Sequence, residues 1–458
     1  LRVFDKGSCL RLDFDINAIL FLRQLCCLGK KIEVECSPGR IQRSVKAFHD
    51  VERSLRKPTL QWLNDKLPDD PRRHTLHLGE CVTDPSEPLP LFKGEKPTKE
   101  EEARRKEDLR LLDRVQQVAD LIIGSFDPFN PLLLSEQLES EGLGIGFRHG
   151  KGAVAERVSQ FEKSDWQTWS AKLQNRFPFE FFGKTAGDPR GKPVNHELAS
   201  RLMCVPKTAK GPRLIASESA PQMWSQQMIW KWLQVQLRSS VARHFIDFHD
   251  QSKSGDLVLS ASLDRKLATV DLSDASDRLT CWTVERLFRS NLTLLSALHA
   301  ARTRYLRDEV SRDTDFLLLR KFASQGTAST FPIQSLCFLF MALGSTIIGP
   351  INRDNVMGML NRVRVFGDDI IVPTYGYARL CRVMDLLQLK VNEAKSYVNG
   401  HFRESCGVDG YRGFDITPVK PKTLDADSPA SCQALVDTSN NLYMKGFWNA
   451  SESLRTLM

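Results

Sequence analysis

The sequence lacks the motifs and the long apolar segments that define several large classes of protein. Its 458 residues contain no HExxH motif, CxxC pair or comparable cluster of histidines and cysteines, which disfavours a zinc enzyme. The longest apolar run, residues 336–349, is too short to span a bilayer and carries Ser345 and Thr346, so we expect a buried helix and no membrane contact. No secretory signal is visible, because Arg23 interrupts the early apolar stretch.

The overall composition is that of a soluble globular protein with a moderate excess of positive charge. Eleven cysteines, an odd number, are scattered without metal-binding spacing, which favours free thiols in a reducing cytosol. The formal net charge of +8 indicates a polyanionic partner without proving one. A chain of this length can bury a large core and should divide into about two to four subdomains.

The first third of the chain carries little identifiable chemistry. Residues 93–114 are densely charged with both signs, which predicts a solvated helix stabilised by ion pairs between successive turns. Residues 142–152 combine glycines with Arg148, His149 and Lys151. Their backbone N–H groups could cradle phosphates, or the stretch could be a flexible loop. It is not a P-loop, because Lys151 is followed by Gly152 rather than by Ser or Thr.

Two adjacent carboxylates, Asp368 and Asp369, stand at a predicted tight turn. β-Branched and aromatic residues surround them in the stretch 364–372, which predicts a β-hairpin. Gly367 relieves the backbone at the turn, so both aspartates are expected near its tip. Neighbouring anions at the rim of a buried sheet require a positive partner, whereas solvated surface acids are the ordinary alternative.

A third carboxylate, Asp271, ends an apolar stretch that predicts a buried strand. A helix is expected to begin near Ser273 or Ser276. Asp274 and Asp277 could simply cap that helix, but capping is a poorer explanation for Asp271, which follows the apolar strand directly.

A basic ribbon precedes these acids in the sequence. Lys207, Lys210 and Arg213 alternate with small and turn-forming residues, an arrangement suited to gripping a triphosphate. A solvated basic loop is the alternative explanation. Further along, residues 322–332 form a small-residue loop in which glycine allows a sugar or base to approach the backbone closely.

These pieces, in this order, resemble the RNA-directed RNA polymerases of positive-strand RNA viruses. The resemblance is greatest to the replicase catalytic subunit of the single-stranded RNA bacteriophages, the leviviruses. The matching segments are Val205-Pro206-Lys207 with Arg213, residues 270–277, Ser324-Gln325-Gly326 with Thr330-Phe331, Phe366-Gly367-Asp368-Asp369, Lys395, residues 402–407 and Tyr411-Arg412-Gly413. Phe366 stands where many relatives have Tyr, and Asp274 adds a carboxylate that many of them lack.

The resemblance implies an α+β fold of the right-hand polymerase type. It has fingers, a ferredoxin-like palm made of an antiparallel sheet plus helices, and a partial thumb. The corresponding divisions are an N-terminal and fingers region at 1–200, fingers with the basic motif at 201–260, a palm at 261–400, and a palm–thumb hairpin with the start of the thumb at 401–458. Family members carry a longer thumb, and the sequence begins with Leu1 rather than Met, so we expect a truncated chain.

The resemblance also implies the roles of particular residues. A pair of magnesium ions, for which Mn²⁺ can substitute, is expected at Asp271, Asp368 and Asp369. Lys395 is the candidate general acid. The nucleotide-binding residues are expected to be Lys207, Lys210 and Arg213 for the triphosphate, and Asp277, Gly326 and Thr330 for the ribose hydroxyl that distinguishes RNA precursors from DNA precursors.

The implied activity is template-dependent RNA synthesis that replicates a positive-strand RNA virus genome by two-metal nucleotidyl transfer. The implied partners are the RNA template and product, nucleoside triphosphates, host translation elongation factors and a ribosomal protein, in the bacterial cytoplasm. Two alternatives remain open, a polymerase of mitochondrial RNA replicons (mitovirus- or narnavirus-like) and an inactive RNA-binding remnant. A reverse transcriptase is disfavoured, because it typically carries Ala where this chain has Gly367.

Overall fold

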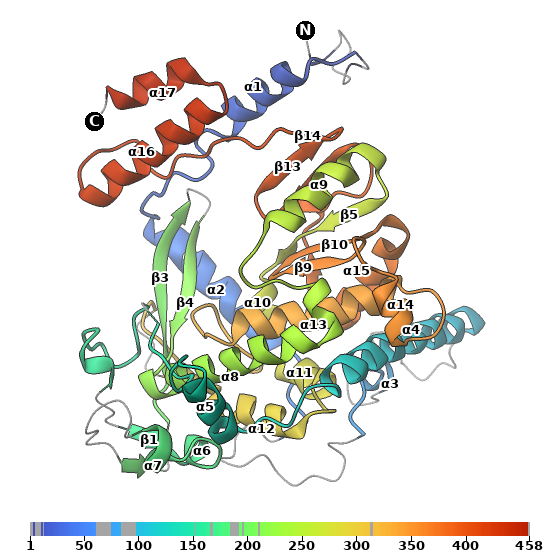
Figure 1. The fold of residues 1–458 in the computed structure, drawn as a ribbon, viewed down its shortest axis with the longest axis vertical. Coiled ribbons are helices and arrows are strands. Elements are labelled where there is room, and N and C mark those ends of the chain that lie inside the picture. The colour runs from blue at the N-terminus through green and yellow to red at the C-terminus, as the bar shows by residue number, and fades with distance from the viewer. Residues whose placement is uncertain are drawn as a thin grey trace.

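The computed structural model mixes helices with small sheets (Figure 1), as the sequence predicts. It describes residues 3–4, 11, 13–60, 75–83, 98–150, 152–164, 168–183, 192–194, 197–208, 211–311 and 315–456. Lys151 and Lys210 therefore lie outside the described residues. Within these ranges every cysteine is a free thiol, and no helix is both long and apolar enough to cross a membrane.

A three-stranded antiparallel sheet lies at the centre of the acidic region. Its strand order is β5 (Leu267–Val270), β10 (Asp369–Pro373) and β9 (Arg364–Phe366). Side chains of β10 alternate between two hydrophobic clusters, as the period of a strand requires. Ile370 and Val372 belong to the main core, whereas Ile371 packs with Val258 and Ala261 of helix α9 (Ser252–Asp264). Both faces of the sheet are therefore covered.

Helix α13 (Thr330–Thr346) forms the middle of the main core. Fifteen of its residues are buried, so the apolar run found in the sequence is a core helix, as predicted. Helix α4 (Lys99–Ile123) packs against it, and Gly344 permits this approach, because a Cβ there would lie 2.7 Å from the Val115 Cα. Of the charged stretch 93–114 that is predicted to be a solvated helix, residues 93–97 lie outside the described residues and residues 99–114 belong to α4. The first half of α4 is mostly exposed, and the second half is largely buried.

A second sheet carries the basic ribbon. Its strand order is β4 (Gly211–Ser217), β3 (Ser200–Thr208), β7 (Tyr305–Asp308) and β8 (Phe316–Leu318). Strands β3 and β4 form a long antiparallel hairpin that rises beside helix α2 (Pro38–Ser54) in Figure 1. Helix α2 packs on β4, and helix α8 (Ala220–Ser239) follows β4 into the main core.

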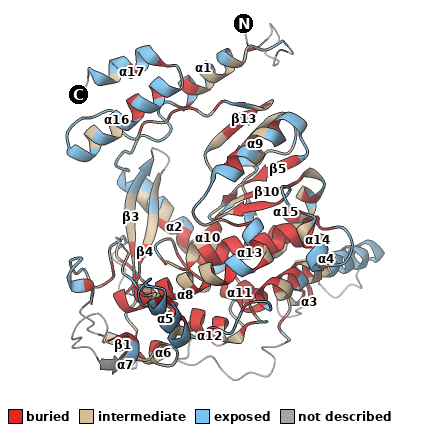
Figure 2. Cartoon of the chain, viewed as in Figure 1, coloured by how far each residue is buried: buried red, intermediate tan, exposed pale blue. Residues whose placement is uncertain are grey.

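The last part of the chain is less deeply buried than the centre, as the pale blue of α16 and α17 in Figure 2 shows. Strands β12 (Phe402–Ser405), β13 (Val408–Tyr411) and β14 (Phe414–Asp415) form an antiparallel sheet beside α9 (Ser252–Asp264). Helix α1 (Ile16–Cys27) joins α16 (Pro429–Met444) and α17 (Trp448–Arg455) through a small cluster that includes Leu20, Leu442 and Phe447.

The remaining elements connect these units. They are α3 (Glu80–Thr83), α5 (Pro131–Ser140), η2 (Glu162–Ser164), β1 (Thr168–Ser170), α6 (Ala171–Gln174), α7 (Phe179–Phe182), β2 (Lys192–Val194), η4 (Val241–His244), β6 (Leu272–Ser273), α10 (Ala275–Arg278), α11 (Cys281–Leu287), α12 (Leu292–Ala301), α14 (Arg353–Met357), η5 (Thr374–Gly376), α15 (Tyr377–Leu386), β11 (Lys390–Val391) and η6 (Glu393–Lys395). The main hydrophobic cluster runs from Leu60 to Leu389 and joins segments on both sides of the predicted boundaries at 200 and 260, which stay predictions.

Candidate functional site

The predicted acidic hairpin is present. Strands β9 and β10 pair with Phe366 opposite Asp369, which leaves Gly367 and Asp368 as a two-residue turn. Gly367 has φ +63°, a value suited to the first position of a tight hairpin turn and unfavourable for other residues. Its N–H donates to Ser335 Oγ of α13 at 3.1 Å, so the turn is anchored on the core helix.

Pairing of β5 with β10 brings the third carboxylate to the same place. The register sets Val270 opposite Ile370 in an antiparallel ladder. Asp271 directly follows Val270, so it stands across from Asp369, with Asp368 one residue further on at the turn. Residues facing each other across such a ladder have Cα atoms about 4.5–5.5 Å apart. The two carboxylate-bearing strands thus meet side by side.

The charges at this edge are strongly coupled. Burial raises the pKa of Asp369 to about 7, and the nearby charges of Asp368 and Asp271 add to this effect. The pKa of Asp368 is also raised, first by burial and then by Asp271, although part of its side chain reaches solvent. Both shifts have the same two causes, because burial disfavours the charged carboxylate and the neighbouring like charges add to this effect.

Asp271 is held by the turn that carries Lys395. Its Oδ2 accepts a hydrogen bond from Asn392 Nδ2 at 2.8 Å and lies 3.3 Å from Lys395 Nζ. The backbone also closes this contact, since Asn392 N–H donates to Asp271 O at 2.9 Å. Burial alone would lower the pKa of Lys395, but Asp271 outweighs it and the pKa is raised. Lys395 is thereby a cation at the carboxylate edge.

Two neighbours of the acidic site, Asn392 and Glu404, were not predicted as site residues from the sequence. Asn392 lies three residues before Lys395 in the turn, and only the fold brings it against Asp271. Glu404 of β12 is close enough to raise the pKa values of both Asp369 and Lys395. Its position within the matched segment 402–407 was the available clue.

The basic ribbon faces the acids. Partial desolvation lowers the pKa of Lys207, the positive charges of Arg213 and Lys395 add to this, and Asp368 and Asp271 oppose it. The Lys207 ammonium therefore lies within electrostatic reach of residues from the ribbon, the hairpin and the Lys395 turn. The structure brings these predicted residues together, although they are spread over almost two hundred positions of sequence.

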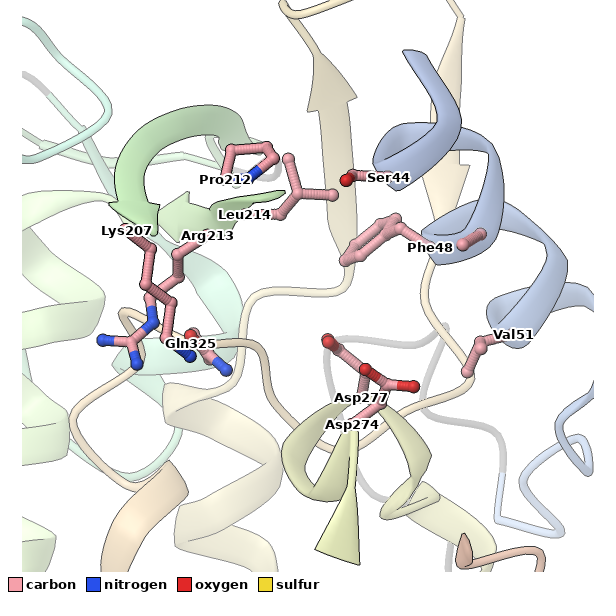
Figure 3. A pocket seen from close by; sticks show the side chains of 11 residues that line it. Ser44, Phe48, Val51, Lys207, Pro212, Arg213, Leu214, Asp274, Asp277 and Gln325 are labelled. Carbon is pink, nitrogen blue, oxygen red and sulfur yellow. The ribbon is translucent and has the colours of Figure 1, made fainter. Parts of the chain in front are cut away.

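A cavity of about 250 Å³ separates the ribbon from helix α2 (Figure 3). Lys207, Arg213 and Gln325 line one side of it, and Asp274 and Asp277 line another. Small-molecule sites commonly measure about 300–1,000 Å³, so this space suits part of a nucleotide rather than a whole one. The remaining wall comes from α2, through Ser44, Ala47, Phe48 and Val51, a contribution that the sequence did not predict.

Helix capping does not account for the two aspartates in the cavity. Asp274 is the N-cap residue of α10, but its side chain makes no capping hydrogen bond and its φ is +53°. Asp277 Oδ1 instead accepts a hydrogen bond from the buried Lys321 Nζ at 2.9 Å.

The small-residue loop is fixed against the ribbon. Gly326 has φ +113°, and a Cβ there would lie 2.2 Å from the Ala216 carbonyl oxygen of β4. Thr327 Oγ1 donates to the buried Glu218 at 2.6 Å, and burial raises the pKa of Glu218. Thr330 Oγ1 donates to Ser324 O at 2.7 Å within the loop. At Gly326 it is therefore the backbone of β4 that approaches the loop closely. Approach of a sugar or base to this loop stays a prediction.

The glycine-rich stretch near residue 148 makes internal contacts. Arg148 Nε donates to Gln227 Oε1 at 3.0 Å, and the His149 ring lies 4.7 Å from the Trp224 ring. Lys163 Nζ donates to the Gly150 carbonyl at 2.9 Å. The contacts of Arg148 and His149 hold this loop against helix α8. Binding of phosphate by the loop stays a prediction.

The donor chemistry of the acidic edge fits a hard divalent cation. Asp271, Asp368 and Asp369 offer only carboxylate oxygens, the donors that Mg²⁺ prefers. In the described part of the chain, however, no three histidine, cysteine, aspartate or glutamate side chains converge closely enough to hold a metal ion in this arrangement. One oxygen of Asp271 is instead in contact with Lys395 and Asn392. Metal binding here stays a prediction.

The region that matches a known protein family contains the predicted residues of this site. The family model described as RNA replicase, beta-chain, matches residues 184–432, more than half of the chain, and includes the ribbon, the acidic strands and Lys395. The chain belongs to the RNA replicase beta-chain family. The prediction of membership in the phage replicase family is confirmed.

The relatives are named as beta subunits or beta chains of the RNA-directed RNA polymerases of phages. The chain is 31% identical to the RNA-directed RNA polymerase subunit beta of Enterobacteria phage SP over 276 residues, 58% of this chain and 44% of that protein. It is 31% identical to that of Escherichia virus Qbeta (55% and 40%) and 32% identical to the beta chain of Escherichia phage MS2 (48% and 37%). The matched region thus spans less than half of each relative.

Among solved structures, similarity extends to the RNA-dependent RNA polymerase of a human picorbirnavirus. The TM-score is 0.40 at 10% identity, covering 57% of this chain and 55% of that one.

Proposed function

We propose that this chain catalyses template-directed RNA synthesis from ribonucleoside triphosphates, as a subunit that replicates the genome of an RNA phage. The observation that carries the proposal is the pairing of β5 with β10. It sets Asp271 across from Asp369 and beside Asp368, with Lys207 and Lys395 within electrostatic reach. Carboxylates that face cations at the rim of a buried sheet suit transfer of a nucleotidyl group from a polyanionic substrate.

The elements can be assigned to the palm, fingers and thumb subdomains of a right-hand polymerase fold. The sheet β5-β10-β9, covered by α13 on one side and α9 on the other, would be the palm. The ribbon β3–β4 with α8 would belong to the fingers. Helices α16 and α17, which pack on α1 outside the main core, would be the start of the thumb. Membership in the replicase family supports this assignment.

Each charged group then has a role in the reaction. Arg213 and Lys207 would bind and neutralise the triphosphate in the cavity between the ribbon and α2. Lys395 would donate a proton to the pyrophosphate leaving group. Asp271, Asp368 and Asp369 would hold magnesium, which when bound supplies charge stabilisation and lowers the pKa of the attacking hydroxyl. Asp277 and the Gly326–Thr330 loop would contact the ribose.

The proposed partners follow from the same family. RNA is the template and product, and the relatives are named as beta subunits or chains, which supports a role within a larger replicase. Host elongation factors and a ribosomal protein as the other subunits, and the bacterial cytoplasm as the location, stay predictions.

The deciding experiment measures ribonucleotide incorporation on an RNA template with and without magnesium. Asp368→Asn keeps the shape of the side chain and removes its charge, so incorporation should fall by about 100-fold or more. Asp354→Asn on the exposed start of α14 is the matched control and should retain activity. Equal incorporation by wild type and Asp368→Asn would overturn the assignment of the acidic site. Absence of incorporation by the wild-type chain, alone and with host extract, would favour an inactive remnant.

A further inference from the structure

Helix α2 comes from the part of the sequence to which no chemistry was assigned, yet it forms a wall of the nucleotide cavity. Its residues Ser44, Ala47, Phe48 and Val51 line the space opposite the ribbon (Figure 3). Their spacing of three and four residues places them on one face of the helix. Phe48 of this face and its neighbour Val45 also pack with Leu202 and Leu306 of the ribbon sheet. The helix therefore has a fixed position beside Asp277.

A buried cation, Lys321, connects this helix to the cavity. Its side chain has no exposed surface, and its Nζ donates to Asp277 Oδ1 at 2.9 Å. The same Nζ lies 3.4 Å from the centre of the Phe48 ring and 3.8 Å from Glu52 Oε2. A buried ammonium is tolerated only where charges and a π face compensate its lost hydration. Two of the three compensating groups belong to α2, and the third is Asp277.

The backbone that carries Lys321 is held from both sides. Glu52 Oε1 accepts hydrogen bonds from the N–H groups of Arg320 and Lys321. On the other side, Phe322 N–H donates to Leu279 O at 2.7 Å and Cys281 N–H to Arg320 O at 2.9 Å. Residues 279–281 directly follow α10, which bears Asp277. Lys321 is thus fixed relative to both the acidic helix and α2.

We propose that Lys321 is a positioning residue for selection of the ribose, through which helix α2 takes part in distinguishing ribonucleotides from deoxyribonucleotides. The inference rests on the proposed function, in which Asp277 contacts the ribose hydroxyl. The hydrogen bond from Lys321 occupies Oδ1 of Asp277 and fixes the rotamer in which the carboxylate lines the cavity. Without the ammonium, Asp277 could turn toward solvent, and the site would lose the polar group that a deoxyribonucleotide leaves unpaired.

The test compares kcat/KM for incorporation of ATP and of 2′-deoxy-ATP. Lys321→Met keeps the length and the packing on Phe48 while removing the charge, and it should lower the ratio of the two values by about 10- to 100-fold. Asp277→Asn should lower the ratio similarly. The double variant should be no worse than Asp277→Asn, because both changes act through one group.

Two further variants separate positioning from simple stability. Lys172→Met removes another fully buried lysine, paired with Glu197 outside the cavity, and should leave the ratio unchanged while lowering thermal stability. Glu52→Gln keeps an acceptor for the two backbone N–H groups and weakens the hold on Lys321, so it should lower the ratio by a smaller factor. If Lys321→Met does not fold, the ratio measured for Glu52→Gln decides whether Lys321 positions Asp277. An unchanged ratio in a folded Lys321→Met or Glu52→Gln variant would overturn the inference.

Failure of the proposed activity is distinguishable from failure of this inference. The dissociation constants of ATP and 2′-deoxy-ATP, measured with magnesium through the thermal stabilisation of the chain, need no turnover. If wild type incorporates nothing, the proposed activity of the chain alone is overturned. The ratio of the two constants in wild type and Lys321→Met then decides the role of Lys321. Equal ratios, or no preference for ATP in wild type, would overturn that role.

Discussion

Lys395 Nζ lies 3.3 Å from Asp271 Oδ2, the same oxygen that accepts a hydrogen bond from Asn392. One short turn therefore contributes both a cation and an amide to the carboxylate at the end of β5. The ion pair is partly exposed, with half of the Lys395 side chain accessible, so its effect on stability is small. The ion pair matters because it fixes the position of the Lys395 ammonium beside Asp271.

Substitution of Lys395 should show whether its side chain acts as a general acid or only supplies a positive charge. Lys395→Met should lower kcat for nucleotide incorporation by about 100-fold, the usual contribution of proton transfer. Lys395→Arg retains the charge, but guanidinium does not release its proton, so it should remain as slow as Lys395→Met. Recovery of kcat in the Arg variant would show that only the charge matters. Lys390→Met, an exposed lysine on neighbouring β11, is the control and should keep wild-type kcat.

Arg213 should control affinity for the triphosphate rather than the chemical step. Its guanidinium lines the cavity from an exposed position on β4. Arg213→Gln should raise KM for nucleotides by about 10-fold or more, because a charge-assisted contact to phosphate is lost. Arg238→Gln, on the exposed side of α8, serves as the control. Steady-state kinetics in which KM for Arg213→Gln equals that of wild type would remove Arg213 from the binding site.

Gly326→Ala should disturb the loop that lies on β4. A Cβ at this position would lie 2.2 Å from the Ala216 carbonyl oxygen, and φ of +113° is unfavourable for alanine. The free energy of unfolding should therefore fall by about 1–3 kcal/mol, and the loop should move away from β4. Gly152→Ala is the matched control, since a Cβ there would meet nothing within 4 Å. Equal urea midpoints for the two variants would contradict the observed packing.

His149 should make the protein sensitive to mild acid. Burial, with a contribution from Lys163, lowers its pKa to about 4 from the ordinary 6.5. Between pH 6.5 and pH 4 the imidazole of His149 is protonated in the unfolded chain but remains neutral in the folded chain. The free energy of unfolding should therefore decrease in this window, by at most about 1.4 kcal/mol per pH unit for this group. Above pH 6.5 the group contributes no slope.

Urea unfolding at several pH values would measure this effect. His149→Phe keeps an aromatic ring beside Trp224 and should flatten the slope between pH 4 and 6.5. His244→Phe changes an exposed histidine and should leave the slope as in wild type. Identical slopes for wild type and His149→Phe would show that His149 is protonated equally in the folded and unfolded chains.

The local sequence pattern was sufficient to predict much of the acidic site. The alternation around Gly367 predicted a hairpin, and the structure has one, with positive φ at that glycine. The apolar residues before Asp271 predicted a buried strand, which is β5. The small residues before α13 predicted a loop that a sugar or base can approach, which stays a prediction, and the contact of Gly326 with Ala216 was not predicted. The hairpin and the strand depend on neighbouring residues, so a single sequence contains the information.

Tertiary structure alone decided which distant groups meet. Nothing near Lys321 in the sequence indicates that Glu52, 269 residues away, and Phe48 compensate its buried charge, or that Asp277 accepts its hydrogen bond. Asn392 likewise reaches Asp271 only because β11 pairs with β6. The sequence by itself determined the hairpin, the strand before Asp271 and the family, because these follow from local periodicity and ordered motifs. The wall of the cavity and the partners of its charges depend on packing between segments that the chain order does not bring together.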